Sequence, residues 1–231
     1  MRITLARAAL HAGLVLAAAL IVALFPATGQ SGPPPPKLVG SSQYVVRPDP
    51  RLCPSPICGG YWVALANRSR TRCADGALLP RCYVALAVDE KRQPLQTGVP
   101  DGALVRAEVE PWTFQGFGNL GALVVTDVRA PIGKGTQGAY FRVRDLGIRC
   151  IKAPCFSLGA ARLNRSSRVI VSSLDLTAPR PTPTPKERAR AEQALTTTNG
   201  LFVLGRIIKT SDAGWILQVS RIYLKAASPR G

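Results

Sequence analysis

The stretch CPSPICGGYWVALANRS, residues 53–69, has a counterpart in CIKAPCFSLGAARLNRS, residues 150–166. Both begin with two cysteines at the same spacing and end in Asn-Arg-Ser, and matched positions lie a constant 97 residues apart. A constant shift across several matched positions indicates an internal duplication. The sequence therefore predicts two copies of one unit, β repeat 1 at residues 43–130 and β repeat 2 at residues 139–226.

Each copy contains segments rich in Val and aromatic residues, which favour strands. In the first copy the expected strands are 43–47, 61–66, 82–88, 103–110 and 122–128. In the second copy they are 139–144, 158–163, 168–174, 201–208 and 215–224. The many Gly (21) and Pro (20) residues fit short strands and turns. We expect an all-β, mainly antiparallel protein that forms two related β lobes or one pseudo-symmetric barrel or sandwich.

One short helix is expected, in the second copy. Thr184 is suited to be its N-cap, Pro185 its first residue and Glu187 the acid of a capping box, so that the helix covers residues 186–195. The preceding Pro-rich stretch, residues 177–185, has the composition of a linker. Because the duplication places this stretch inside a copy, we expect an exposed loop.

The N-terminus has the pattern of an export signal. Arg2 and Arg7 precede an apolar run at residues 8–25, and small residues follow it. We predict a signal peptide at residues 1–29 and a flexible, Pro-rich lead-in at residues 30–42, for a protein exported to the periplasm or the extracellular space. The alternative is an uncleaved anchor, because 18 apolar residues approach the length that spans a bilayer. After signal cleavage no membrane span is expected.

The only histidine of the chain, His11, lies in the predicted signal peptide. The mature chain therefore lacks the residues of Ser-His-Asp and Cys-His triads and of histidine-ligated zinc hydrolases. We expect a protein that is not an enzyme and that needs no cofactor or metal. A carboxylate-dependent glycan-acting enzyme is the catalytic alternative, since Glu108 and Glu110 share a strand face and Asp127 lies on the next strand. Arg106 and Arg129 could instead neutralise these acids in a salt-bridged face.

Six cysteines in an exported chain predict disulfides. If equivalent pairs form equivalent bonds, the duplicated C-x4-C segments give Cys53–Cys58 and Cys150–Cys155, and elimination leaves Cys73–Cys82. A metal site is disfavoured because the mature chain has no histidine and the thiols would have to stay reduced outside the cell.

The chain is strongly basic. Lys and Arg total 30 against 13 acids, and removing the two arginines of the signal peptide leaves 28 − 13, or +15. This charge favours an anionic partner, such as an envelope polymer or lipid, although an Arg-rich solvated surface is the simpler alternative and a protein partner also remains open. Nucleic acid is disfavoured, because the basic residues are not interleaved with aromatic ones. The possible anion-binding residues are Arg142, Arg144, Arg149, Lys152, Arg162, Arg165 and Arg168.

Residues 116–121 read Gly-x-Gly-x-x-Gly, the pattern of a dinucleotide-binding loop. In that fold a helix follows the glycines, whereas here a strand is expected, so a glycine-rich hairpin is favoured. Trp112, Phe114 and Phe117 surround it, either as an exposed aromatic platform for a sugar or peptide or packed over the core.

The two Asn-Arg-Ser motifs, at Asn67 and Asn164, are possible glycosylation sites. Because each lies at the end of an expected strand and the two occupy matching positions, we interpret both asparagines as turn residues.

Three segments carry a resemblance to a known family: RLCPSPICGGY at 51–61, GFGNLG at 116–121 and GIRCIKAPC at 147–155. They resemble a family of exported bacterial domains of unknown function. The resemblance covers most of the mature chain and implies a bacterial, Gram-negative source, but it supplies no activity and no catalytic residues.

A weaker resemblance is to Kazal-type protease inhibitors, through Cys-Pro, Pro-Ile-Cys-Gly and the Tyr that follows in residues 53–61. It implies an inhibitory Cys53–Cys58 loop, although the cysteine spacing departs from theirs. The expectation favoured here is an exported, non-catalytic β module that binds an envelope or extracellular partner.

Overall fold

The computed structural model describes residues 42–225 of the 231-residue chain, all within one compact unit. The predicted signal peptide and nearly all of the lead-in lie outside the described residues. Within residues 42–225 no helix is long and apolar enough to cross a membrane. We call residues 42–132 the first half and residues 139–225 the second half.

The strands of the first half follow the Val-rich and aromatic segments. Its main strands are β1 (Ser42–Pro48), β2 (Tyr61–Leu65), β5 (Cys82–Val84), β6 (Leu86–Val88), β7 (Ala103–Glu110) and β10 (Ala122–Ile132). Four two-residue strands that were not predicted form two small hairpins: β3 (Thr71–Arg72) with β4 (Leu78–Leu79), and β8 (Thr113–Phe114) with β9 (Gly118–Asn119).

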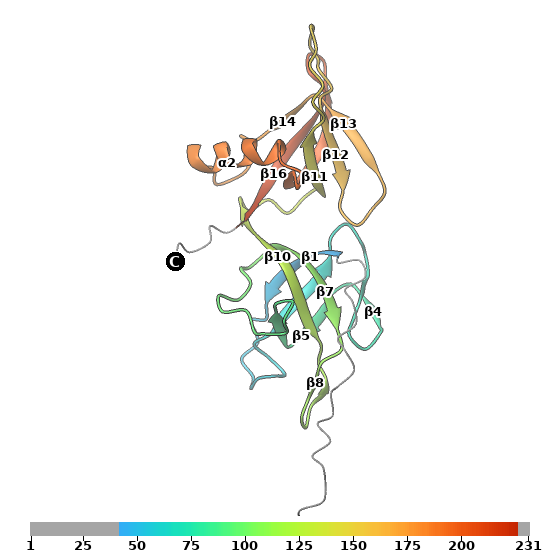
Figure 1. Cartoon of the computed structure of the whole chain (residues 1–231), viewed down its shortest axis with the longest axis vertical. Helices are drawn as coiled ribbons and strands as arrows, with labels where there is room; N and C mark the ends of the chain where they lie inside the picture. The colour runs from blue at the N-terminus through green and yellow to red at the C-terminus, as the bar shows by residue number, and fades with distance from the viewer. Residues whose placement is uncertain (1–41, 226–231) are drawn as a thin grey trace, which may run out of the picture. The chain divides into compact units, whose positions relative to one another are not determined.

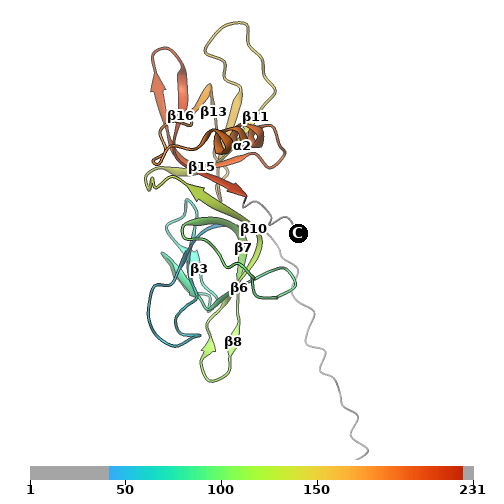
Figure 2. The ribbon, with the colours of Figure 1, turned by 90° about the vertical axis from the view of Figure 1, so that its left-hand side faces the viewer.

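The second half repeats this order of main strands, as Figures 1 and 2 show. Its strands are β11 (Ala139–Asp145), β12 (Leu158–Arg162), β13 (Arg168–Val171), β14 (Ser173–Asp175), β15 (Leu201–Thr210) and β16 (Gly214–Lys225). The prediction of a mainly antiparallel β protein is confirmed, and the repeated order of strands fits the predicted duplication.

The strands pair in the same way in each half. The sheet runs in the order β13-β12-β11-β15-β16-β10-β7-β1-β2-β5. Starting from the β16–β10 contact, the strands of the two halves follow in the same order in opposite directions. In addition, β6 pairs with β10 and β14 with β16, and both of these contacts are parallel. Each half therefore has five strands in the order 3-2-1-4-5, and because strand 3 also pairs with strand 5, the order around the half is 1-2-3-5-4. This connectivity is that of the OB-fold, a partly open five-stranded Greek-key barrel.

The predicted strands 82–88 and 168–174 are each divided in two, and the topology explains why. At Ala85 and at Ser172 the third strand leaves its antiparallel neighbour and begins to follow the fifth strand. At these two positions the backbone N–H donates to Gly121 O and Trp215 O, respectively. The third strand of each half thus pairs first with the second strand and then with the fifth, and this change of partner curves the sheet.

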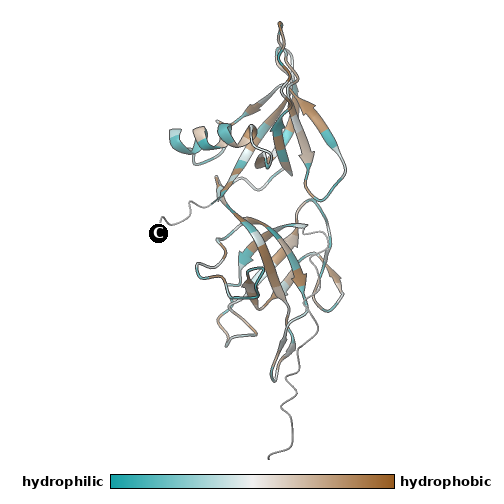
Figure 3. Ribbon diagram, viewed as in Figure 1, coloured by the Kyte–Doolittle hydropathy of each residue, from teal (hydrophilic) through white to brown (hydrophobic). Residues whose placement is uncertain are grey.

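The helix α2 (Pro185–Leu195) begins as the sequence predicted. The side chain of Thr184 accepts a hydrogen bond from the N–H of Glu187, and the Glu187 carboxylate accepts one from the N–H of Thr184. Ala191 is fully buried against the second half's core. The rest of the helix is largely hydrophilic, as Figure 3 shows, so it covers its half with one narrow face.

Antiparallel pairing of β10 with β16 joins the halves. Ala130 lies opposite Leu224, and on either side Arg129 faces Lys225 and Pro131 faces Tyr223. Each half has its own apolar core, and a third buried cluster lies at the junction with residues from both. The junction is therefore built into the fold by both hydrogen bonds and buried apolar surface.

Candidate anion-binding site at the junction of the two halves

The two Asn-Arg-Ser motifs meet at the junction. Asn67 follows β2 with a backbone φ of 58°, the left-handed conformation that Asn tolerates in turns. Its side-chain amide donates to the carbonyl oxygens of Tyr140 (2.7 Å) and Leu163 (3.0 Å) in the second half. Its side-chain oxygen accepts a hydrogen bond from the N–H of Tyr140 at 2.8 Å. The turn residue thus holds backbone groups of the other half.

Asn164 makes the reciprocal contacts with the first half. It has a φ of 53°, donates to Gln43 O (2.8 Å) and Ala66 O (2.9 Å), and accepts from the N–H of Gln43 at 3.0 Å. The two arginines that follow the asparagines complete the exchange: Arg68 Nε donates to Asn164 O and Arg165 Nε to Asn67 O. We call this set of hydrogen bonds the Asn clasp. It satisfies buried backbone groups on both sides of the junction.

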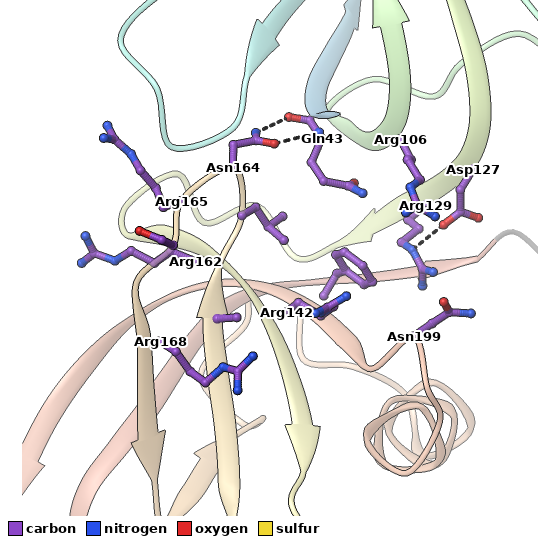
Figure 4. A pocket seen from close by; sticks show the side chains of 14 residues that line it. Gln43, Arg106, Asp127, Arg129, Arg142, Arg162, Asn164, Arg165, Arg168 and Asn199 are labelled. Carbon is purple, nitrogen blue, oxygen red and sulfur yellow. Dashed lines mark hydrogen bonds and ion pairs between the residues drawn. The ribbon is translucent and has the colours of Figure 1, made fainter. Parts of the chain in front are cut away.

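Beside the Asn clasp lies a cavity of about 400 Å³ whose wall comes from both halves. Figure 4 shows Arg106 and Arg129 on one side with Arg142 near them, and Arg162 and Arg165 extending away on the other side. Asp127 is the one carboxylate among the lining residues. The neutral part of the wall includes Asn199 and Phe202. We call this space the arginine cavity, and its arginines are Arg106, Arg129, Arg142, Arg162, Arg165 and Arg168.

Arg129 is the most buried of these arginines, with 9% of its side chain exposed. Its Nε lies 2.8 Å from Asp127 Oδ2, and its guanidinium carbon lies 4.2 Å from the centre of the Phe202 ring. Burial lowers the pKa of Arg129, while the Asp127 carboxylate opposes that shift. Lys225 Nζ also lies 3.1 Å from Asp127 Oδ1. The Asp127 carboxylate therefore forms ion pairs with two cations, Arg129 and Lys225, and the cavity keeps an excess of positive charge.

The remaining cavity arginines have no ion pair with a carboxylate in the part of the chain that the structure describes. Within residues 42–225, no carboxylate forms an ion pair with any of the following: Arg106, Arg142, Arg162, Arg165 and Arg168. Arginine presents several N–H donors in a planar fork that matches the oxygens of carboxylate, sulfate or phosphate groups. The arrangement can accept an anion with more than one charged group.

Of the seven basic residues proposed from the sequence, the structure brings four to this cavity: Arg142, Arg162, Arg165 and Arg168. Arg144 and Lys152 are exposed and do not line it, and Arg149 forms an ion pair with Asp145 at 3.0 Å. These three lie at or beyond the other end of the β11–β12 ladder, where Asp145 pairs with Leu158.

Arg106 and Arg129 come from the first half, and the sequence had assigned them only to a salt-bridged face. Their place at the cavity could not be read from the sequence, because it depends on how the two halves join through the β10–β16 pairing.

The three disulfides form with the predicted pairing, Cys53–Cys58, Cys73–Cys82 and Cys150–Cys155. The first C-x4-C turn is held against its own half. Arg51 pairs with Asp49 at 2.9 Å and donates to Ile57 O, and Tyr83 donates to Pro56 O. The turn is exposed, as an inhibitory loop would have to be, and inhibition stays a prediction.

The three carboxylates proposed for an enzyme do not share one cavity wall. Asp127 lines the arginine cavity, whereas Glu108 and Glu110 do not. Glu110 forms an ion pair with Arg92 at 2.8 Å, and Asp127 with Arg129 and Lys225. Burial, and secondarily the neighbouring Glu110, raises the pKa of Glu108. Within the described residues, no group of three metal-ligating side chains is present.

The glycine-rich segment lies in a hairpin, as predicted, although its two short strands β8 and β9 were not predicted, and Gly116 and Gly118 adopt positive φ angles in it. Trp112 and Phe114 are half-buried and Phe117 is 48% exposed. None of the three lines the arginine cavity, so the aromatic platform stays a separate prediction.

A family model described as a domain of unknown function, DUF6748, matches residues 42–229. The chain belongs to the DUF6748 family. This confirms the resemblance to an uncharacterised domain family. No curated protein and no solved structure matches the chain. The function of this DUF6748 domain therefore has to be argued from its own residues.

The position of the arginine cavity is unusual for the topology. OB-folds commonly bind ligands on strands 2 and 3 and with the loops between strands 1 and 2 and strands 4 and 5. In the second half of the DUF6748 domain those loops are residues 146–157 and 211–213. The cavity does include Arg162 of strand 2 and Arg168 of strand 3, but in place of those loops it uses residues 163–166 and Asn199, which belong to the loops at the opposite ends of the strands.

Proposed function

We propose that this protein is an exported, non-catalytic β module that binds an anionic partner in the arginine cavity. The observation that carries the proposal is the gathering of six arginines around one space of about 400 Å³ with Asp127 as the single carboxylate in its wall. Like charges held together oppose folding. A ligand that supplies the missing negative charge removes that repulsion and gains charge-assisted hydrogen bonds.

Export and the lack of catalysis rest on other features. Three disulfides persist in oxidising compartments such as the periplasm or the cell exterior, and the N-terminal pattern of residues 1–29 is that of a signal peptide. The predicted mature chain has no histidine, and the cavity offers guanidinium groups that bind and orient an anion but do not exchange protons near neutral pH. These features favour a binding module over an enzyme.

A pair of matched variants tests the site. Arg142→Ala/Arg162→Ala removes two charges from the cavity, and Arg144→Ala/Lys152→Ala removes two exposed charges outside it. Trigalacturonate, a short trivalent carboxylate, is titrated calorimetrically into the purified, disulfide-bonded protein at low ionic strength. Each hydrogen bond from a charged donor contributes about 1.5–3 kcal/mol, so the first variant should bind at least about tenfold more weakly. The second should bind nearly as the wild type does.

Equal weakening by the two variants would show that only overall charge matters and would contradict the cavity as the site. Circular dichroism and a thiol assay establish that each variant is folded and oxidised. Repeating the titration at increasing salt concentration checks the electrostatic origin, since screening should weaken binding to the wild type more than to the cavity variant.

A further inference from the structure

The arginine cavity has two neighbouring cavities. It shares Arg129 and Asn199 with a space of about 360 Å³ beside helix α2, and it shares Arg162, Arg165 and Ser166 with a space of about 530 Å³ beside Asn67. Because of these shared residues the three spaces are neighbours, in the order α2, arginine cavity, Asn clasp. We call the three spaces together the groove.

Positive charge extends along this groove beyond its centre. The space beside α2 adds Arg190 and Lys225, and Arg190 donates to the backbone carbonyl of Lys225. Arg162 and Arg165 continue the charge into the space beside Asn67. Asp127 is the one carboxylate among the residues that line the three spaces. A row of cations along a groove fits a chain with a charge at each repeat better than it fits one compact ion.

The uncharged side chains of the groove indicate which kind of chain it fits. Amide and hydroxyl side chains line the same spaces as the cations, among them Gln193, Thr197, Asn199, Ser166 and Ser167. Such groups suit the hydroxyls of sugar rings. The one aromatic residue in the three walls is Phe202, which is 6% exposed and lies beneath the Arg129 guanidinium. Single-stranded nucleic acids are held by stacking on exposed aromatic rings, and this groove offers none.

We propose that the groove binds a linear acidic polysaccharide, with one chain lying across all three spaces. This inference rests on the proposed function, because the arginine cavity supplies the central contacts. Contacts along one chain act together: once the central residues are bound, the outer ones are held close to their sites, which strengthens binding without any new type of contact.

Chain length tests the inference. Decagalacturonate should bind the wild type at least about tenfold more tightly than trigalacturonate, beyond the statistical advantage of its additional binding registers. Arg190→Ala, at the outer end of the groove, should remove much of that difference and leave trigalacturonate binding unchanged. Lys186→Ala is the control, because Lys186 is an exposed cation of the same helix that lines none of the three spaces.

The possible outcomes separate the two proposals. If trigalacturonate binds but decagalacturonate has no advantage, or if Arg190→Ala and Lys186→Ala act alike, the extended groove is wrong and the anion site stands. If neither oligomer binds, both proposals fail. Polyphosphate and single-stranded oligo(dT) of equal charge are compared in the same assay, and tighter binding of either than of decagalacturonate would overturn the assignment to a polysaccharide.

Discussion

The two halves place very different residues at equivalent positions of the junction. The strand registers match four of the five arginines that strands contribute to the cavity with an apolar residue of the other half, Arg168 being the exception. Arg142 corresponds to Val45, Arg162 to Leu65, Arg106 to Leu204 and Arg129 to Tyr223. Val45, Leu204 and Tyr223 belong to the buried apolar cluster at the junction. One side of the junction is apolar and stabilising, and the other side is cationic.

The difference shows that the fold does not need the arginines. Both copies form the same strands with the same registers, so an apolar residue satisfies the backbone geometry at each of these positions. Apolar side chains also gain free energy by leaving water, whereas clustered cations repel one another. Arginines in the places of stabilising residues are best explained by a ligand.

The largest loss of stability is expected when an arginine replaces a buried residue on the apolar side of the junction. Leu204 is 1% exposed in the junction cluster and occupies the position of Arg106. Leu204→Arg would bury a charge without a partner, and we expect it to lower the free energy of unfolding by more than about 4 kcal/mol. Urea denaturation followed by circular dichroism measures this loss, with Leu204→Met as a volume-conserving control. A loss under about 1 kcal/mol would mean that the two sides are interchangeable after all.

The Asn clasp should respond equally from both sides. Asn67→Ala and Asn164→Ala each remove three side-chain hydrogen bonds and place at positive φ an alanine, which tolerates that conformation less well than asparagine. We expect each to cost about 2–3 kcal/mol of unfolding free energy. Asn67→Gly and Asn164→Gly keep the backbone conformation accessible, so they separate lost hydrogen bonds from strain. Unequal costs in the two halves would break the symmetry argued here.

The smallest change in stability is expected when the cationic side is given the residues of the apolar side. Arg142→Val/Arg162→Leu copies Val45 and Leu65 onto the second half. These arginines form no ion pair with a described carboxylate, so the free energy of unfolding should change by less than about 1 kcal/mol. Binding of trigalacturonate should nevertheless be lost. Destabilisation by several kcal/mol would show that the arginines are structural.

Local sequence signals identified much of the fold. All ten predicted strands are present. Val-rich and aromatic segments that are separated by turn residues favour strands over helices. The Thr184 cap could be predicted from the sequence because both of its hydrogen bonds join residues within one stretch of four. The disulfide pairing followed from matching two short cysteine turns. Two-residue strands such as β3 and β4 were missed, since they carry too few residues to show a period.

The sequence alone therefore determined the elements, their duplication, the disulfides and the excess of positive charge. It could not determine where that charge gathers. Asn67 and Asn164 read as turn residues because their turns are local, but their side chains hold backbone groups about a hundred positions away. Arg106 and Arg129 join Arg142 and Arg162 because the β10–β16 pairing, the Asn clasp and the junction cluster hold the two halves together. Strand order and register determine which arginines come together. Neither can be predicted from the residues that flank each arginine in the sequence.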